Sequence, residues 1–362
     1  MSQDFTGLIQ AFAFQKAACE HMGSPFSGRV LGILAEDIAE QGVFAELAAA
    51  WKGAAVSSAL NDAAPLRFLG GLHYLTLSGV DPGLSALYPA QGGEPSQEAL
   101  AANLRRAGRE HGAILARFAL SAPQTNEVRR SICLVGGFLT LARLTGLPLR
   151  CLEIGASAGL NQNWDRYRYR FGDAAWGDGE SHLTIEADWT GPPPWLGPAK
   201  VAERGGCDLR PIDTGDADQA LRLQAYIWPD QADRLVRLRA AIALARRFPP
   251  KIDAAEAADW VEAKARPQPG VATVLFHSVV WQYLPKSTQQ RISAAMERAG
   301  EAASADSPLA WLQMEPDPAN PAGAMEVRLT LWPENRRMLL ARVHPHGAQV
   351  SWLSEIATKT VI

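Results

Sequence analysis

Apolar residues in the first third of the chain recur with the period of an α-helix. Phe5, Leu8 and Phe12 fall at i, i+3 and i+7, so a helix would bring them onto one face. Similar stripes continue to residue 118, and short breaks that contain glycine and proline separate them. This part has no run of alternating β-branched residues. Residues 1–125 are therefore predicted to form a helical N-terminal domain, a cap over the ligand cleft.

The remainder of the chain alternates between strand and helix patterns. Residues 149–154, 271–276 and 309–314 are short, mainly apolar runs, as expected for strands buried on both faces of a sheet. Helical patterns lie between such runs, and this alternation is typical of a parallel α/β sheet. Between residues 327 and 352, apolar and polar positions alternate, which predicts antiparallel strands at one edge.

A helix is predicted immediately before the first of these strands. Ser121 and Gln124 have the spacing of a capping box, and Thr125 offers a second start. Gly146 marks the end of this helix. The helix would lead the chain into a second domain, residues 126–362.

The segment LEIGASAGLN, Leu152–Asn161, combines the end of a strand with a glycine turn. Its two glycines allow a sharp turn and bring bare backbone close to a ligand. A helix expected after the turn would direct its free N–H groups outward. Ligands of open α/β sheets bind beyond the carboxyl ends of the strands. We therefore predict cofactor contacts from Glu153, Gly155, Ala156, Ser157, Gly159 and Asn161. The alternatives are a tight turn that binds nothing and, for Asn161, a helix cap.

Two other predicted strands end in polar residues. His277 and Ser278 follow one, and Glu315 follows another, so all three are expected at the same rim. An imidazole at a strand end can accept a proton from a substrate. His277 and Glu315 are therefore the candidate catalytic residues, and Ser278 is a further cofactor contact. A hydrogen-bonded structural histidine and a glutamate that caps a turn are the alternatives.

The glycine turn resembles the first motif of class I S-adenosylmethionine-dependent methyltransferases, with Glu153 two residues before Gly155. The resemblance implies a Rossmann-like, doubly wound α/β sheet with antiparallel C-terminal strands, and S-adenosylmethionine as cofactor. It also implies that Glu153 orients the amino-acid part of that cofactor. LEIGASAGLNQNWDRYRY, QTNEVRR, WPDQADRLVRLRAA and HSVVWQYL resemble a bacterial family known only as a domain of unknown function.

A methyltransferase also needs an acidic residue after its second strand, to bind the ribose hydroxyls. The strand-like residues 183–188 favour Glu186 or Asp188, and we take Asp188 as the cofactor contact. Asp208 and Asp213 are the other candidates.

Three functions fit these features. The first is methyl transfer from S-adenosylmethionine to a small molecule. The second is a non-catalytic, methyltransferase-like protein that binds a ligand or serves as a scaffold. The third is an α/β serine hydrolase, because Ser157 lies in GASAG, which matches the nucleophile elbow G-x-S-x-G.

Composition limits the partners. A net charge of −3 and an isoelectric point near 6.2 give no general attraction to nucleic acid or to anionic membranes. The four cysteines form no CxxC pair, so neither a zinc site nor another metal site is predicted. No apolar run reaches membrane-spanning length and no signal peptide is recognised, so we expect a cytoplasmic protein. The oligomeric state is left open.

Overall fold

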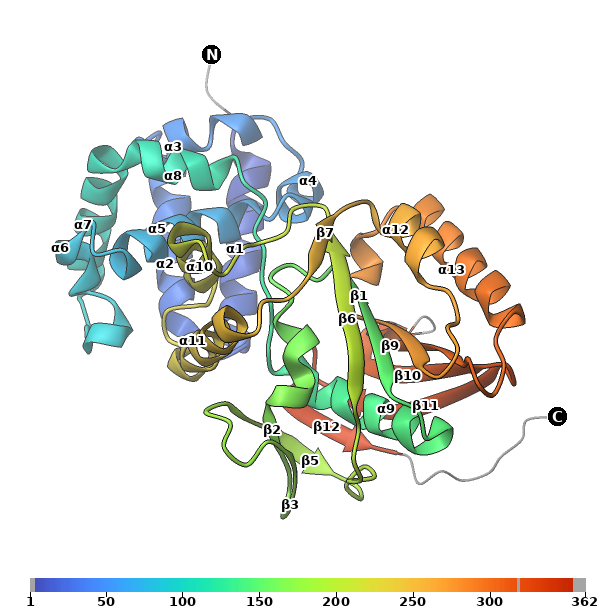
Figure 1. Cartoon of the computed structure of the whole chain (residues 1–362). Helices are drawn as coiled ribbons and strands as arrows, with labels where there is room; N and C mark the ends of the chain where they lie inside the picture. Colours follow the sequence, from blue (N-terminus) through green and yellow to red (C-terminus); the bar gives the residue numbers. More distant parts are fainter. Residues whose placement is uncertain (1–3, 318–319, 354–362) are drawn as a thin grey trace. The chain divides into compact units, whose positions relative to one another are not determined.

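A computed structural model describes residues 4–317 and 320–353 (Figure 1). The chain folds into two compact units. Unit 1 consists of Met1–Thr125 and Gly215–Arg239, and unit 2 of Asn126–Thr214 and Ala240–Ile362. A helical stretch from the middle of the chain thus belongs with the N-terminal residues.

The described part of unit 1 contains helices and no strand. Phe5, Leu8 and Phe12 are buried in its core, as their spacing predicts. The helices are α1 (Thr6–His21), α2 (Pro25–Ala39), α3 (Val43–Leu47), η1 (Ala49–Trp51), α4 (Val56–Asn61), α5 (Ala64–Leu77), α6 (Pro82–Ser85), η2 (Pro89–Gln91), α7 (Gln97–Glu110), α8 (Gly112–Ala119) and α10 (Ala217–Ala225), with α11 (Ala232–Arg247) crossing into unit 2.

The WPDQ motif of residues 228–231 holds unit 1 together. The carboxylate of Asp230 accepts a hydrogen bond from the Phe26 backbone N–H at 2.9 Å and another from the Ser24 hydroxyl. Asp230 therefore caps the first turn of α2 although it lies about two hundred residues away in sequence. This contact gives the motif a structural role.

Unit 2 is built on a nine-stranded sheet in the order β5-β12-β11-β10-β9-β8-β1-β6-β7. Most neighbouring pairs are parallel, and the antiparallel pairs join β9, β10, β11 and β12. The fold is therefore α/β with a large, mostly parallel sheet and antiparallel C-terminal strands. The strands are β1 (Leu149–Ile154), β5 (Asp188–Thr190), β6 (Val201–Asp208), β7 (Ile252–Ala254), β8 (Ala272–Ser278), β9 (Leu309–Asp317), β10 (Asn320–Trp332), β11 (Arg336–Val343) and β12 (Gln349–Trp352).

The chain order of the parallel strands reverses beside β1. From β1 the chain proceeds to β6 and β7 on one side, and it then returns to β8 and β9 on the other side. Ligands of open α/β sheets bind at such a switch point, beyond the carboxyl ends of the strands. The carboxyl ends of β1, β6 and β8 are thus the place to look for a site.

Helices cover the sheet on both faces. The helix α9 (Arg130–Thr145) packs against β8 to β11 on one face, whereas α12 (Ala257–Lys264) and α13 (Lys286–Glu301) lie together on the other (Figure 1). Short 3₁₀ helices η3 (Leu160–Arg166) and η4 (Trp281–Tyr283) follow β1 and β8. A separate three-stranded sheet contains β2 (Arg168–Phe171), β3 (Ala174–Gly177) and β4 (Thr184–Glu186).

The predicted start of the helix before β1 is wrong, although its end is confirmed. The helix α9 begins at Arg130 rather than at Ser121 or Thr125, and it ends at Thr145, with Gly146 at φ +67°. The reason for the late start is a tertiary contact, because the Asn126 side chain accepts the Leu160 N–H at 2.9 Å.

The α-helix predicted after the glycine turn is also wrong, since η3 is a short 3₁₀ helix with a kink at Asn163. The guanidinium of Arg204 donates to the Gln162 carbonyl and to both carboxylate oxygens of Asp165, at 2.8 to 3.0 Å. The Gln162 carbonyl is a group that a continuing helix would use, and the chain enters β2 instead. The N-cap of η3 is Gly159, so Asn161 is not the helix cap that was one of its expected roles.

Candidate functional site

The glycine turn is held in an unusual backbone conformation by its neighbours. Gly155, Ser157 and Gly159 all have positive φ, of +64°, +53° and +64°. For Ser157 this left-handed conformation costs energy that the surroundings must supply. The Ser157 N–H donates to the Asp208 carboxylate at 2.9 Å, and Asn126 accepts the Leu160 N–H beyond the turn. Side chains from two other segments therefore fix the turn.

Three polar side chains of this segment are buried without a hydrogen-bond partner among the described residues. The atoms are Glu153 Oε2, Ser157 Oγ and Asn161 Oδ1. Burial raises the pKa of the Glu153 carboxyl well above its usual range; the nearby Gln162 side chain opposes this effect and the charge of Asp208 adds to it. Buried polar atoms are normally paired. Three unpaired ones along a single turn are typical of a site that receives polar ligand groups.

A pocket of about 280 Å³ opens at the carboxyl ends of β1, β6 and β7. This volume lies just below the range of ~300–1,000 Å³ for small-molecule sites. Most of its lining is apolar, and two carboxylates, Asp208 and Glu256, contribute to it. Gly155 and Cys207 form its floor, and Val280 and Tyr283 come from the segment after β8.

His277 and Glu315 form a buried pair at the ends of β8 and β9, as their positions in the sequence predict. His277 Nδ1 lies 2.6 Å from Glu315 Oε1, and both side chains are buried. The same oxygen accepts the backbone N–H groups of Val280 and Trp281, at 3.0 and 3.3 Å. Because that oxygen acts as an acceptor, Nδ1 carries the hydrogen and Nε2 is left as an acceptor. The indole of Trp281 stacks on the imidazole at 5.4 Å.

The segment that follows β8 is strained. Val279 has φ +54°, a conformation that β-branched residues rarely adopt. Its neighbour Ser278 is half-buried, and the carbonyl of Ser278 accepts a hydrogen bond from Arg130 at 3.3 Å. Strain of this kind often accompanies functional sites. Here it lets the chain turn so that Val280 reaches both Glu315 and the pocket.

The QTNEVRR motif connects these pieces, whereas its sequence favours a solvated helix cap over a role at the site. Asn126 binds the glycine turn, and Arg130 donates to the Ser278 carbonyl and also to the Pro345 carbonyl at 2.9 Å. Arg129 donates to the His346 carbonyl at 3.2 Å. The only sequence signal was a polar cluster directly before an apolar helical stripe.

The structure does not bring Asp188 to this site. Asp188 begins β5, at the edge of the large sheet remote from β6 and β7. Glu186 lies in the separate three-stranded sheet. The strand beside β1 is β6, and it ends in Asp208, which lines the pocket. Asp208, one of the alternative candidates, therefore holds the position expected of the ribose-binding acid.

The arrangement around Ser157 does not favour a hydrolase. A serine nucleophile needs a base within hydrogen-bond reach, yet Ser157 Oγ has no partner among the described residues. His277 is paired with Glu315 instead, and Asp208 contacts the backbone of Ser157. The α-helix that follows a nucleophile elbow is replaced here by η3.

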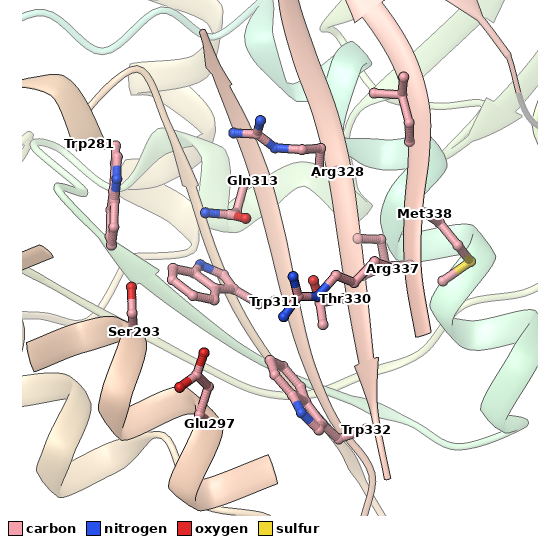
Figure 2. A pocket seen from close by; sticks show the side chains of 12 residues that line it. Trp281, Ser293, Glu297, Trp311, Gln313, Arg328, Thr330, Trp332, Arg337 and Met338 are labelled. Carbon is pink, nitrogen blue, oxygen red and sulfur yellow. The ribbon is translucent and has the colours of Figure 1, made fainter. Parts of the chain in front are cut away.

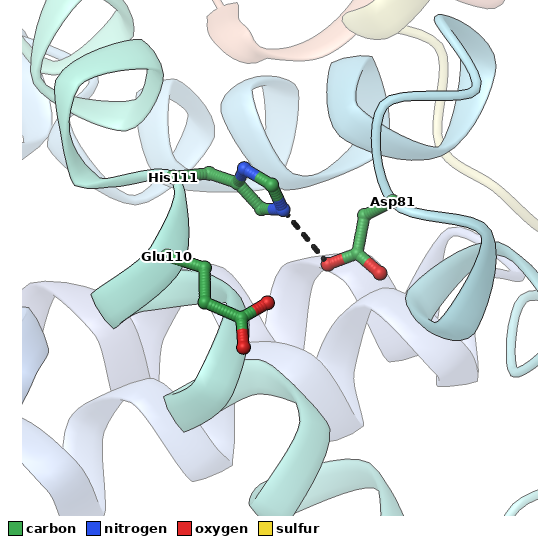
Figure 3. Close-up of side chains that lie close together, drawn as sticks. All are labelled: Asp81, Glu110 and His111. Atoms are coloured by element: carbon green, nitrogen blue, oxygen red, sulfur yellow. Dashed lines mark ion pairs between the residues drawn. The ribbon is translucent and has the colours of Figure 1, made fainter.

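A cluster of possible metal ligands occurs in unit 1. Asp81, Glu110 and His111 bring one donor atom each within 4.8 Å of one another (Figure 3). Arg106 donates to both oxygens of Asp81, at 2.7 and 3.0 Å, and also pairs with Glu110. The Leu84 N–H donates to Asp81 as well. These contacts explain the cluster as an ion-pair network around a helix cap.

The fold defines an α/β protein with a pocket at the switch point of its sheet. The chain belongs to the family described as "uncharacterized protein conserved in bacteria" (DUF2332), which it matches over residues 9–352. No curated protein and no solved structure matches the chain. Within the part of the chain that the structure describes, no helix is long and apolar enough to cross a membrane.

Proposed function

We propose that unit 2 binds S-adenosylmethionine and transfers its methyl group to a small molecule. The observation that carries the proposal is the pocket beside Gly155, with an acidic residue, Asp208, at the end of the neighbouring strand. A mainly apolar cleft that also contains carboxylates suits a nucleoside, whose base is planar and whose ribose presents two hydroxyl donors.

The residues present fit such a cofactor. Asp208 lines the pocket and would accept hydrogen bonds from the ribose hydroxyls, since the two oxygens of a carboxylate together offer about four acceptor sites. The base would lie among Val280, Tyr283 and other apolar residues of the pocket. The unpaired atoms of Glu153 and Ser157 would serve the polar amino-acid part.

The bound cofactor would supply a reactive methyl sulfonium, so the protein needs mainly to position the acceptor and exclude water. His277 would take the acceptor's proton at Nε2 while Glu315 holds the ring through Nδ1. At present the amide nitrogen of Gln313 lies 3.5 Å from Nε2, so Gln313 would have to yield this position to the acceptor.

Isothermal titration calorimetry with S-adenosylmethionine, with its demethylated product and with NAD tests the proposal. We expect both sulfur ligands to bind and NAD to bind far more weakly. Asp208→Asn should lower the affinity about tenfold or more, because a hydrogen bond to a charged group contributes roughly 1.5–3 kcal/mol.

Ser157→Ala serves as the matched control within the same site. It should weaken binding less than Asp208→Asn does, because it removes one neutral hydroxyl. Absence of binding by either sulfur ligand at millimolar concentration would refute the proposal.

A further inference from the structure

A second hollow lies on the face of the large sheet that is turned away from α9. Leu312 of β9 packs against Gly137 of α9, so its neighbour Trp311 points to the opposite face. Only two residues separate β9 from β10, so no helix between these strands covers that face. The hollow has a volume of about 520 Å³ and is bordered by α13, η4 and β9 to β11 (Figure 2).

One wall of the hollow is aromatic. Trp281 and Trp311 meet edge to face with ring centres 5.5 Å apart, and Trp332 packs against Gly300 at the end of α13. Only 9% of Trp311 is exposed, and its indole N–H has no hydrogen-bond partner among the described residues. Figure 2 shows this nitrogen on the side of the ring that faces Gln313.

An unpaired buried donor costs roughly 1–3 kcal/mol. A ligand atom that accepts from the Trp311 N–H would recover this energy. The aromatic wall suits a planar ring, and the N–H requires that the ring carry a hydrogen-bond acceptor.

The other wall is basic. Arg328 and Arg337 project from β10 and β11 into the hollow, whereas Glu297 of α13 is its only carboxylate among the described lining residues (Figure 2). Arg337 forms no ion pair with any residue that the structure describes. Arg328 lies 3.4 Å from Glu326, which sits outside the hollow. The excess of positive charge favours an anionic group on the ligand.

We propose that this hollow is a second small-molecule site, for a planar ligand that carries a carboxylate or a similar anionic group. The ring lies against the tryptophans, and the anionic group takes the place of the Gln313 amide, between the Trp311 N–H and Arg328. The Gln313 amide lies 3.5 Å from His277 Nε2, so this group would take the place given above to the methyl acceptor, and the inference rests on the proposed function and names the chemical class of that acceptor. The probes are titrated without S-adenosylmethionine, so their binding is tested separately from that of the cofactor. The helix η4 joins the two pockets, because Trp281 lines the hollow and Tyr283 lines the nucleoside pocket.

Calorimetric titration with three isosteric probes tests the ligand class. They are 1-naphthoate, the neutral 1-naphthylmethanol and the cationic 1-naphthylmethylammonium. We expect naphthoate to bind about tenfold or more tightly than the alcohol, and the cation to bind most weakly. Equal affinity for the three probes, or no binding of naphthoate at millimolar concentration, would overturn the proposal.

Charge variants test the location. Arg337→Gln should weaken naphthoate binding about tenfold, and Glu297→Gln should strengthen it, because it removes a repulsive charge. Arg298→Gln removes an equal charge from the residue next to Glu297, but Arg298 lines a different surface and should have little effect. Arg337 and Glu297 are exposed, so both variants should fold. If Arg337→Gln has no effect, or if Arg298→Gln weakens binding as much, the site is not this hollow.

Discussion

Replacement of Glu153 by glutamine should change how the stability of unit 2 depends on pH. Glu153 is 3% exposed, and burial holds its folded-state pKa well above the value of about 4.5 expected in the unfolded chain. The folded protein therefore keeps a proton that the unfolded chain releases. Stability from this proton is complete below pH 4.5 and is lost as the pH rises toward the folded pKa.

The size of the effect follows from one proton. Each pH unit between the two pKa values lowers the free energy of unfolding by about 1.4 kcal/mol. Glu153→Gln keeps the shape of the side chain and cannot ionise. The stability difference between this variant and the wild type should therefore grow by about 1.4 kcal/mol per pH unit above pH 5, until the folded pKa is reached.

Urea unfolding at several pH values between 5 and 8, followed by tryptophan fluorescence, measures this difference. The signal reports mainly on unit 2, because all tryptophans except Trp51 and Trp228 lie there. Glu262→Gln is the control in the same unit, since Arg291 keeps the pKa of Glu262 below its usual value and no titration occurs above pH 5. If the curves for wild type and Glu153→Gln run parallel, Glu153 is ionised and our account of its burial fails.

Two further predictions concern the glycine turn and the core of unit 1. Gly155→Ala should destabilise unit 2 by more than Gly146→Ala does, because both residues have positive φ but only at Gly155 would a Cβ meet a neighbour, Val280 Cγ2 at 2.4 Å. Gly146→Ala should cost about 1–2 kcal/mol because of backbone strain. Gly155→Ala should cost roughly 1–3 kcal/mol more, because the new Cβ also overpacks against Val280. Equal losses of stability in chemical denaturation would contradict this. Burial lowers the pKa of His73 in the folded protein to about 4. As the pH falls, His73 therefore takes up a proton in the unfolded chain before it does so in the folded protein. Unit 1 should lose up to about 3 kcal/mol of stability between pH 6.5 and pH 4. His73→Gln should remove that acid sensitivity in differential scanning calorimetry, and an unchanged pH profile would show that His73 is not its source.

The sequence predicts the strands that are buried along most of their length. It does not predict elements whose form depends on contacts with distant segments. β1, β8 and β9 are mainly apolar runs, and most of their residues are buried. β6 is only partly buried and carries Glu203 and Arg204, so it gave no such signal. Between β1 and β6 the chain also forms the separate sheet of β2, β3 and β4 and the edge strand β5. Asp188 therefore follows the next strand-like segment after the glycine turn in the sequence, although Asp208 ends the strand that lies beside β1.

The candidate site shows the same division. The sequence predicts that His277 and Glu315 lie at one rim, because each comes at the end of an apolar run, and the hydrogen bond between them is found only in the structure. The contact of Asn126 with Leu160 spans separate segments and has no local pattern. The 3₁₀ form of η3 likewise depends on Arg204, forty residues away in the chain.

The bonds from Arg129 and Arg130 to the turn between β11 and β12 have a consequence for the order of folding. Arg129 and His346 are separated by 217 positions, and Arg130 also reaches the end of β8. Such distant pairings form late, because the entropy of closing a long loop must be overcome first. The contacts of Arg129 and Arg130 with the turn between β11 and β12 can therefore form only after almost the whole chain has left the ribosome.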